Sequence, residues 1–179
     1  MKRLSMVLAL MLVLSAGSVW AQDVPKVEVF GGGSVLNINS NDFKVTPFGW
    51  DASVNGNVNK TVGIVGEIGG NYETIHGEKL KIHSFLGGAQ FSHRVSKASV
   101  FAQTKAGFMH FSGGGESDNN FQLGFTGGID VHAGKKVSIR VFQFDWLPTR
   151  AKSDSGSGHE WVKNVTRGSI GIVFRSASK

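Results

Sequence analysis

The sequence predicts an all-β fold, an eight-stranded antiparallel up-and-down transmembrane β-barrel. Three observations lead to this class. Apolar residues recur with a period of two, the alternating segments are long for strands of a soluble sheet, and short connections alternate with long polar ones. The composition agrees, because 25 of the 179 residues are glycine and only three are proline, which is typical of a chain with many strands.

The N-terminus, residues 1–21, is predicted to be a secretory signal peptide. Lys2 and Arg3 precede an apolar run over Met6–Leu14, and a stretch ending at Ala21 suits signal-peptide cleavage. The apolar run is too short for a spanning helix. The exported remainder can then enter a membrane only as a closed barrel, because a barrel is the one non-helical structure that pairs every backbone group in lipid.

Residues 22–179 form the predicted barrel domain. Its clearest strand is Phe121–Ala133, in which every second residue from Phe121 onward is apolar or glycine. Each strand has at least about nine residues, as a tilted strand needs to cross a bilayer. The eight predicted strands are Val27–Leu36, Phe48–Val58, Val62–Tyr72, Ile82–Arg94, Val100–Phe108, Phe121–Ala133, Val137–Leu147 and Val165–Phe174.

The connections between these strands differ in length at the two ends of the predicted barrel. Three are tight turns: Asn59-Lys60, Val95–Ala98 and Gly134–Lys136. Four are predicted to be long polar loops: Ile38–Pro47, Glu73–Lys81, His110–Asn120 and Pro148–Asn164. Outer-membrane barrels have short turns on the periplasmic side and long loops outside. This asymmetry predicts a location in the bacterial outer membrane.

The strand Val137–Leu147 breaks the alternation. Val137, Ile139 and Val141 share a face with Gln143 and Asp145, whereas Arg140 would share its face with three aromatic residues. A β-bulge near Val141 would bring the apolar residues of both halves onto one face. Continuous ladder pairing through Val141 and Phe142 would contradict this hypothesis.

Composition excludes several classes of function. The net charge is +6, and +4 once Lys2 and Arg3 leave with the signal peptide, without a cluster of basic residues that would suit a nucleic acid. The chain has no cysteine, so that no disulfide framework is expected. The histidines lack the spacing of metal sites, and neither a metal nor a cofactor is predicted.

With the strands placed, the chain resembles the small outer-membrane β-barrel families, whose best-known architecture is the barrel domain of outer-membrane protein A. Its most specific segments are Gly49–Asn57, Phe85–Gly88 and Ile170–Phe174. The resemblance implies two kinds of partner. The barrel would contact outer-membrane lipid and lipopolysaccharide, and the C-terminal strand with Ile172 and Phe174 would be recognised by the outer-membrane assembly machinery.

The predicted inward face carries charges of both signs on different strands. Charged groups enclosed in a narrow barrel must pair or meet water. The lumen of eight strands is just wide enough for side chains to fill it. We therefore expect a structural, salt-bridged network in a closed interior. Its predicted members are Glu28, Asp51, Glu67, Arg94, Lys105, Asp130, His132 and Arg167.

These features predict a non-enzymatic barrel with a structural or surface-interaction role, and no catalytic residue is assigned. One alternative is a narrow channel for ions or small solutes that uses the lumen charges. A second is a lipid A deacylase-like hydrolase, because His110 and Ser112, with Glu116 nearby, contain the residue types of an acyl-transfer site. The sequence contains no motif that identifies a ligand.

Overall fold

A computed structural model describes residues 24–39, 44–75, 78–113, 116–152 and 159–176. The predicted signal peptide lies outside the described residues. Eight long strands follow one another: β1 (Val27–Asn39), β3 (Phe48–Asn57), β4 (Val62–Ile75), β5 (Glu78–Arg94), β6 (Ala98–Gly113), β7 (Glu116–His132), β8 (Val137–Trp146) and β11 (Val165–Arg175). Three shorter strands are β2 (Lys44–Val45), β9 (Thr149–Lys152) and β10 (His159–Val162).

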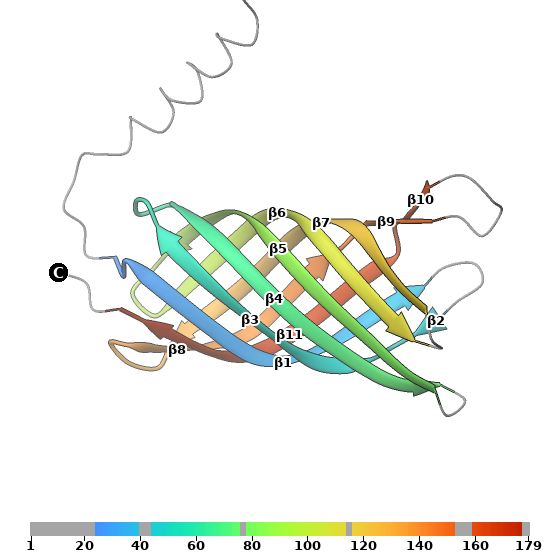
Figure 1. The fold of residues 1–179 in the computed structure, drawn as a ribbon. Coiled ribbons are helices and arrows are strands. Elements are labelled where there is room, and N and C mark those ends of the chain that lie inside the picture. The colour runs from blue at the N-terminus through green and yellow to red at the C-terminus, as the bar shows by residue number, and fades with distance from the viewer. Residues whose placement is uncertain (1–23, 40–43, 76–77, 114–115, 153–158, 177–179) are drawn as a thin grey trace, which may run out of the picture.

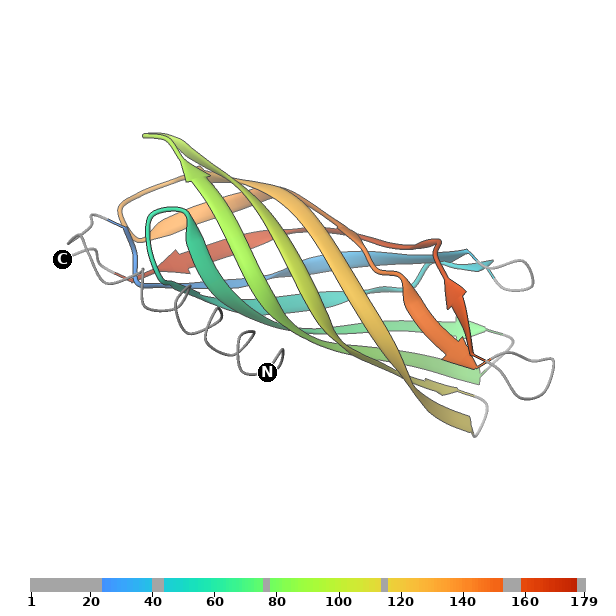
Figure 2. The same cartoon turned by 90° about the horizontal axis from the view of Figure 1, so that it is seen from above.

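The eight long strands close into a barrel (Figure 1). Each pairs antiparallel with the next long strand along the chain, and β11 pairs with β1 from Glu28↔Arg175 to Ile38↔Val165. Figure 2 shows the tilt of the strands against the barrel axis, which closure requires. The structure thus confirms the predicted eight-stranded up-and-down barrel.

The two ends of the barrel differ, and we name them the turn end and the loop end. The turn end carries the three tight connections, the start of β1 and the end of β11. The loop end carries β2, β9 and β10 (Figure 1). There, β9 extends the wall beyond β8 by pairing with β7, and β10 pairs with β9. The N-terminus of β1 and the C-terminus of β11 therefore lie together at the turn end.

Two of the predicted long loops are wrong. Most of Glu73–Lys81 is paired strand, because the β4–β5 ladder continues to Ile75↔Glu78. Most of His110–Asn120 is likewise paired, up to Gly113↔Glu116. Alternation of apolar residues does not predict these polar strand ends as strands, because backbone pairing does not require an apolar side chain on the outer face. The other two predicted loops contain the short strands β2, β9 and β10.

The outer surface of the barrel is apolar. Phe48, Ile64 and Ile170 are 71%, 63% and 62% exposed, and large apolar residues face outward on every long strand. A soluble monomer rarely exposes such a continuous apolar surface, whereas a hydrocarbon surrounding suits it. Aromatic residues near both ends of the wall are exposed as well, among them Trp50, Tyr72, Trp146, Trp161, Phe91 and Phe174. Among the described residues, no helix is long and apolar enough to span a membrane.

The predicted bulge in β8 is present. In the β7–β8 ladder Ile129 pairs with Phe142 and Asp130 pairs with Arg140, so that Val141 is the extra residue. The β8–β11 ladder is irregular at the same place. Val141 and Phe142 are consequently both exposed, although they are neighbours in the sequence. The bulge reverses the alternation and turns Arg140 into the lumen, where it is 4% exposed.

Candidate functional site: the barrel lumen

The middle of the lumen contains a cluster of five charged side chains, each from a different strand. These are Asp51 on β3, Glu67 on β4, Lys105 on β6, Asp145 on β8 and Arg167 on β11. Alternation along the strands aims all five inward, and all are at most 4% exposed. We call this set the central cluster. It joins five strands of the wall through side chains alone.

The two cations of the central cluster each bind more than one carboxylate. Lys105 Nζ lies 2.5 Å from Glu67 Oε2 and 3.2 Å from Asp145 Oδ1. Arg167 Nε lies 2.9 Å from Asp145 Oδ2, and its Nη2 forms an ion pair with Glu67. Asp51 is held more weakly, because its Oδ2 lies 3.7 Å from Arg167 Nη2 and its Oδ1 has no hydrogen-bond partner.

Neutral side chains complete the central cluster. Thr126 Oγ1 donates to Asp145 Oδ1 at 2.5 Å, and Gln143 Nε2 donates to Asp145 Oδ2 at 3.0 Å and to Asp51 Oδ2 at 3.3 Å. Gly69 leaves room for the large arginine, because a Cβ there would lie 2.8 Å from Arg167 Nη1. Charged groups that are taken out of water need such additional hydrogen bonds to offset their desolvation.

A second ion pair lies between the central cluster and the turn end. Arg140 donates to Asp130 from Nε at 2.7 Å and from Nη2 at 3.1 Å, which is a bidentate contact. Its guanidinium carbon lies 4.2 Å from the ring centre of Phe30 and 4.1 Å from that of Phe101. The planar group is therefore held between two rings in the lumen.

A third ion pair lies at the turn end. Arg94 Nη2 lies 2.9 Å from Glu28 Oε2. Asn55 and Asn57 each donate a side-chain hydrogen bond to the same carboxylate oxygen at 3.1 Å. His132 belongs to no ion pair among the described residues. Its Nε2 lies 2.9 Å from the hydroxyl of Ser99, and its Nδ1 donates to Ser96 O at 3.4 Å.

The structure thus separates the eight predicted lumen residues into groups. Asp51, Glu67, Lys105 and Arg167 meet in the central cluster; Glu28 pairs with Arg94; Asp130 and His132 find other partners. The sequence prediction missed two residues, Arg140 and Asp145. Both lie in β8, where the alternation reverses at the bulge. The predicted bulge itself could have identified them, because reversing the alternation at the bulge makes both Arg140 and Asp145 face the lumen.

Apolar side chains fill the loop end of the lumen, which the sequence prediction also missed. All of them except Leu86 lie within or close to the segments predicted to be loops, where alternation does not assign a facing. Because apolar groups exclude water, these side chains close the lumen between the central cluster and the loop end. We call this set the apolar plug, and it consists of Leu36, Ile38, Val45, Leu80, Ile82, Leu86, Met109, Leu147 and Val165.

The candidate hydrolytic residues lie outside the lumen, on the outer face of β6 near the loop end. His110 Nδ1 is 2.8 Å from Asn119 Oδ1, and no hydrogen bond is found between His110 and Ser112 in the described part of the chain. The side chain of Glu116 lies outside the described residues. Across the ladder, His110 pairs with His83, whose Nε2 lies 3.2 Å from the Tyr72 hydroxyl.

Three carboxylates of the central cluster approach one another as metal ligands do. One oxygen atom from each of Asp51, Glu67 and Asp145 lies within 4.8 Å of the others. Lys105 and Arg167, however, already bind these carboxylates. The positive charge that a metal ion would supply is therefore provided by the protein itself, and the arrangement is that of an ion-pair network.

Comparison with solved structures finds the same fold in small outer-membrane proteins. Neisserial surface protein A aligns with a TM-score of 0.60 and 13% identity, over 86% of this chain and 99% of that one. The outer membrane protein OprG from Pseudomonas aeruginosa gives 0.57 and 7%, over 88% and 98%. Ail, the attachment invasion locus protein of Yersinia pestis, gives 0.50 and 16%, over 85% and 99%.

By sequence, neither a protein-family model nor a curated protein matches the chain. At identities of 7–16%, the structural likeness establishes the fold alone. That fold is the one that the resemblance to small outer-membrane barrels led us to expect.

Proposed function

We propose that the protein is a bacterial outer-membrane barrel with a structural or surface-interaction role, non-enzymatic and closed to ions. The observation that carries the proposal is the filling of the lumen. From the turn end to the loop end, the Arg140 pair between two aromatic rings, the central cluster and the apolar plug follow one another along the axis. A barrel filled in this way stabilises itself in a membrane but offers no continuous path for water.

Outer-membrane lipid and lipopolysaccharide are the proposed surroundings of the apolar outer surface. The C-terminal strand is the proposed recognition element for the assembly machinery. In support, Ile172 and Phe174 on β11 point outward and are 46% and 59% exposed. Polar hairpin ends and the segment around β9 and β10 project at the loop end, where contacts with other surface molecules would form.

Recordings in planar bilayers test the closed lumen. The full-length exported protein, refolded in detergent and shown to be folded by heat-modifiable gel migration, is expected to give no reproducible conductance steps. A large porin serves as the positive control in the same bilayers. Steps of constant size that change in a Lys105→Met variant would overturn the proposal and assign a narrow channel through the central cluster.

Analysis of lipid A tests the non-enzymatic assignment. Lipid A from cells with and without the protein is expected to have the same acyl chains by mass spectrometry. If an acyl chain is lost only in cells with the protein, and is retained in cells with a Ser112→Ala variant, the protein is a hydrolase instead. Membrane fractionation of the same cells tests the outer-membrane location.

A further inference from the structure

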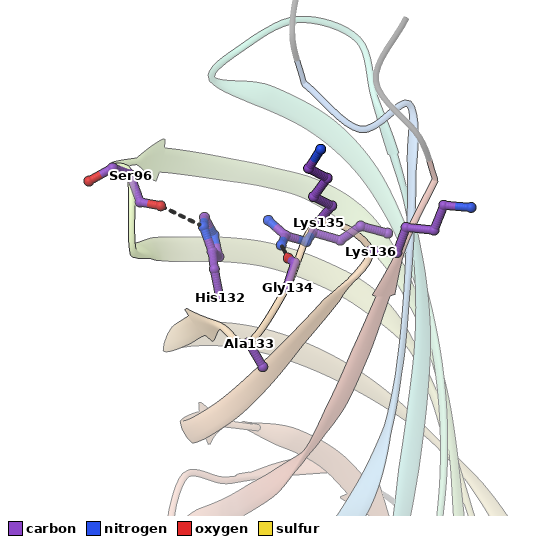
Figure 3. A pocket seen from close by; sticks show the side chains of 7 residues that line it. Ser96, His132, Ala133, Gly134, Lys135 and Lys136 are labelled. Carbon is purple, nitrogen blue, oxygen red and sulfur yellow. Dashed lines mark hydrogen bonds between the residues drawn. The ribbon is translucent and has the colours of Figure 1, made fainter.

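The lumen opens at the turn end into a cavity of about 830 Å³, which we call the vestibule. Inward-facing His132 and Arg175 line it together with Ser96 and the turn of residues 133–136. Figure 3 shows Ser96 and His132 on one side, and Lys135 and Lys136 on the other. An adjoining cavity of about 480 Å³ shares Ser96, His132 and Arg175 and extends to Lys60 and Arg94.

The vestibule is blind. On its inner side lies the Arg140–Asp130 pair, whose arginine is held between Phe30 and Phe101. A molecule that enters from the turn end therefore cannot pass onward through the barrel without breaking a bidentate ion pair. The volume of the vestibule, moreover, falls within the range of about 300–1,000 Å³ that is usual for small-molecule sites. The geometry is that of a binding cup.

The charge around the vestibule is strongly positive. Glu28 is the one carboxylate among the described residues of the turn end, which are 24–28, 57–62, 93–98, 132–137 and 174–176. That carboxylate is already paired with Arg94. The same residues contain seven cationic side chains: Lys26, Lys60, Arg94, Lys97, Lys135, Lys136 and Arg175.

The loop end has no such imbalance. Its described residues contain six Lys and Arg and five Asp and Glu. These residues are 36–39, 44–48, 72–75, 78–81, 110–113, 116–120, 147–152 and 159–164. The positive potential thus belongs to one mouth of the barrel. Like charges that converge on a concave, partly enclosed surface concentrate the field there and attract anions.

Arg175 supplies a positioned donor at the wall of the vestibule. Its Nη2 donates to Gly134 O at 2.5 Å and to Val137 O at 3.4 Å, which holds the guanidinium in place. Its Nε is buried without a hydrogen-bond partner, and no carboxylate lies within 4.0 Å of the group in the described part of the chain. A buried donor without a partner costs free energy, which an acceptor oxygen of a bound anion would recover.

We propose that the vestibule binds a phosphate group. A guanidinium with a free donor, two adjacent lysines and the hydroxyl of Ser96 suit an anion with several oxygen acceptors and more than one negative charge. The phosphate could belong to a soluble phosphate compound or to the headgroup of a phospholipid at the membrane surface. The chemistry recognised is the same, and the site is additional to the structural role proposed above.

Calorimetric titration of the exported barrel in nonionic detergent, with inorganic phosphate and pyrophosphate at constant ionic strength, tests the proposal. We expect saturable binding that a Lys135→Gln/Lys136→Gln variant weakens about tenfold, because two charged hydrogen-bonding partners are lost. Both lysines are exposed and away from the ion pairs of the lumen, so that folding is retained. The matched control is Lys79→Gln/Lys81→Gln at the loop end, which has the same change in charge.

The control is expected to bind pyrophosphate as the wild type does. Absence of pyrophosphate binding in the wild type would overturn the proposal. An equal loss of affinity in both double variants would also overturn it, because such a loss depends on net charge alone. Titration in phosphatidylcholine nanodiscs with and without phosphatidylglycerol separates the two sources. Weaker pyrophosphate binding in the presence of phosphatidylglycerol assigns the headgroup, and unchanged binding assigns a soluble phosphate compound; either result supports the site.

Discussion

Arg167 is completely surrounded by protein, and its partners differ in how firmly they hold it. Asp145 contacts both Arg167 and Lys105 and receives hydrogen bonds from Thr126 and Gln143. Asp51 is equally buried but reaches Arg167 only at 3.7 Å and keeps one oxygen without a partner. Two carboxylates of one cluster therefore differ in the free energy that they contribute to the fold.

Asp145→Asn and Asp51→Asn measure this difference. We expect Asp145→Asn to lower the free energy of unfolding by about 3 kcal/mol, because two buried cations lose a shared partner. Asp51→Asn is expected to cost about 1 kcal/mol or less, since a single long contact is lost. Urea titration of the protein folded into lipid vesicles gives both values, and an equal cost for the two variants would contradict the assignment.

Arg140 and Asp130 are expected to act as one unit. A double-mutant cycle with Arg140→Met and Asp130→Asn should give a coupling free energy of about 2 kcal/mol, because each single change leaves a buried partner unpaired. Methionine retains apolar contact with Phe30 and Phe101. Independent, additive costs of the two changes would show that the pair contributes nothing beyond packing.

At the scale of the element, β8 shows how one extra residue decides which side chains meet water, protein or lipid. Val141 and Phe142 both face outward, and the alternation on either side of them is opposite in phase. Because of this shift, Arg140 and Asp145 both reach the lumen, although a spacing of five positions would place them on opposite faces of a regular strand. The strand could not keep both apolar halves outward in an uninterrupted ladder.

Deletion of Val141 is expected to leave the barrel folded, whereas deletion of Val141 together with Phe142 is expected to prevent stable folding. Without Val141, Phe142 follows Arg140 directly, and strict alternation keeps Arg140 and Asp145 in the lumen. Without both residues, an uninterrupted β8 would place the charge of either Arg140 or Asp145 on the outer surface, at a cost of roughly 2–4 kcal/mol for an arginine near the middle of a bilayer. Heat-modifiable migration on detergent gels should be retained in the single deletion and lost in the double deletion, and equal behaviour of the two variants would refute the role of the bulge.

For the whole molecule, the outer and inner surfaces have exchanged the roles that they have in a soluble protein. The charged and hydrogen-bonded residues fill the interior, and the large apolar residues face outward. This inversion is stable only if hydrocarbon surrounds the wall, because water would leave the apolar surface unfavourably exposed. The polar strand ends at the loop end extend past the exposed aromatic residues, where water surrounds them.

Ile68→Lys and Thr74→Lys test this inversion on one face of one strand. Both residues are exposed on β4, Ile68 near the middle of the wall and Thr74 beyond Tyr72 at the loop end. In vesicles, Ile68→Lys should lower the free energy of unfolding by roughly 2–4 kcal/mol and Thr74→Lys by almost nothing. Equal and small effects at both positions would show that the wall faces water.

From the sequence alone come the barrel class, the eight long strands, the apolar outer face of the clearest strands and the bulge in β8. These follow from alternation and turn spacing, which are local properties of the chain. Seven of the eight predicted lumen residues are in ion pairs, because a side chain's facing can be read from its own strand.

Only the tertiary structure decided which of those charges meet. Asp51 and Arg167 are far apart in the sequence, and their contact depends on barrel closure and on the register between strands that are not neighbours. Alternation does not distinguish polar hairpin ends from loops, because the backbone ladder extends beyond the apolar part of the wall. The vestibule is likewise invisible in the sequence, since closure alone gathers the separate basic turns around one mouth.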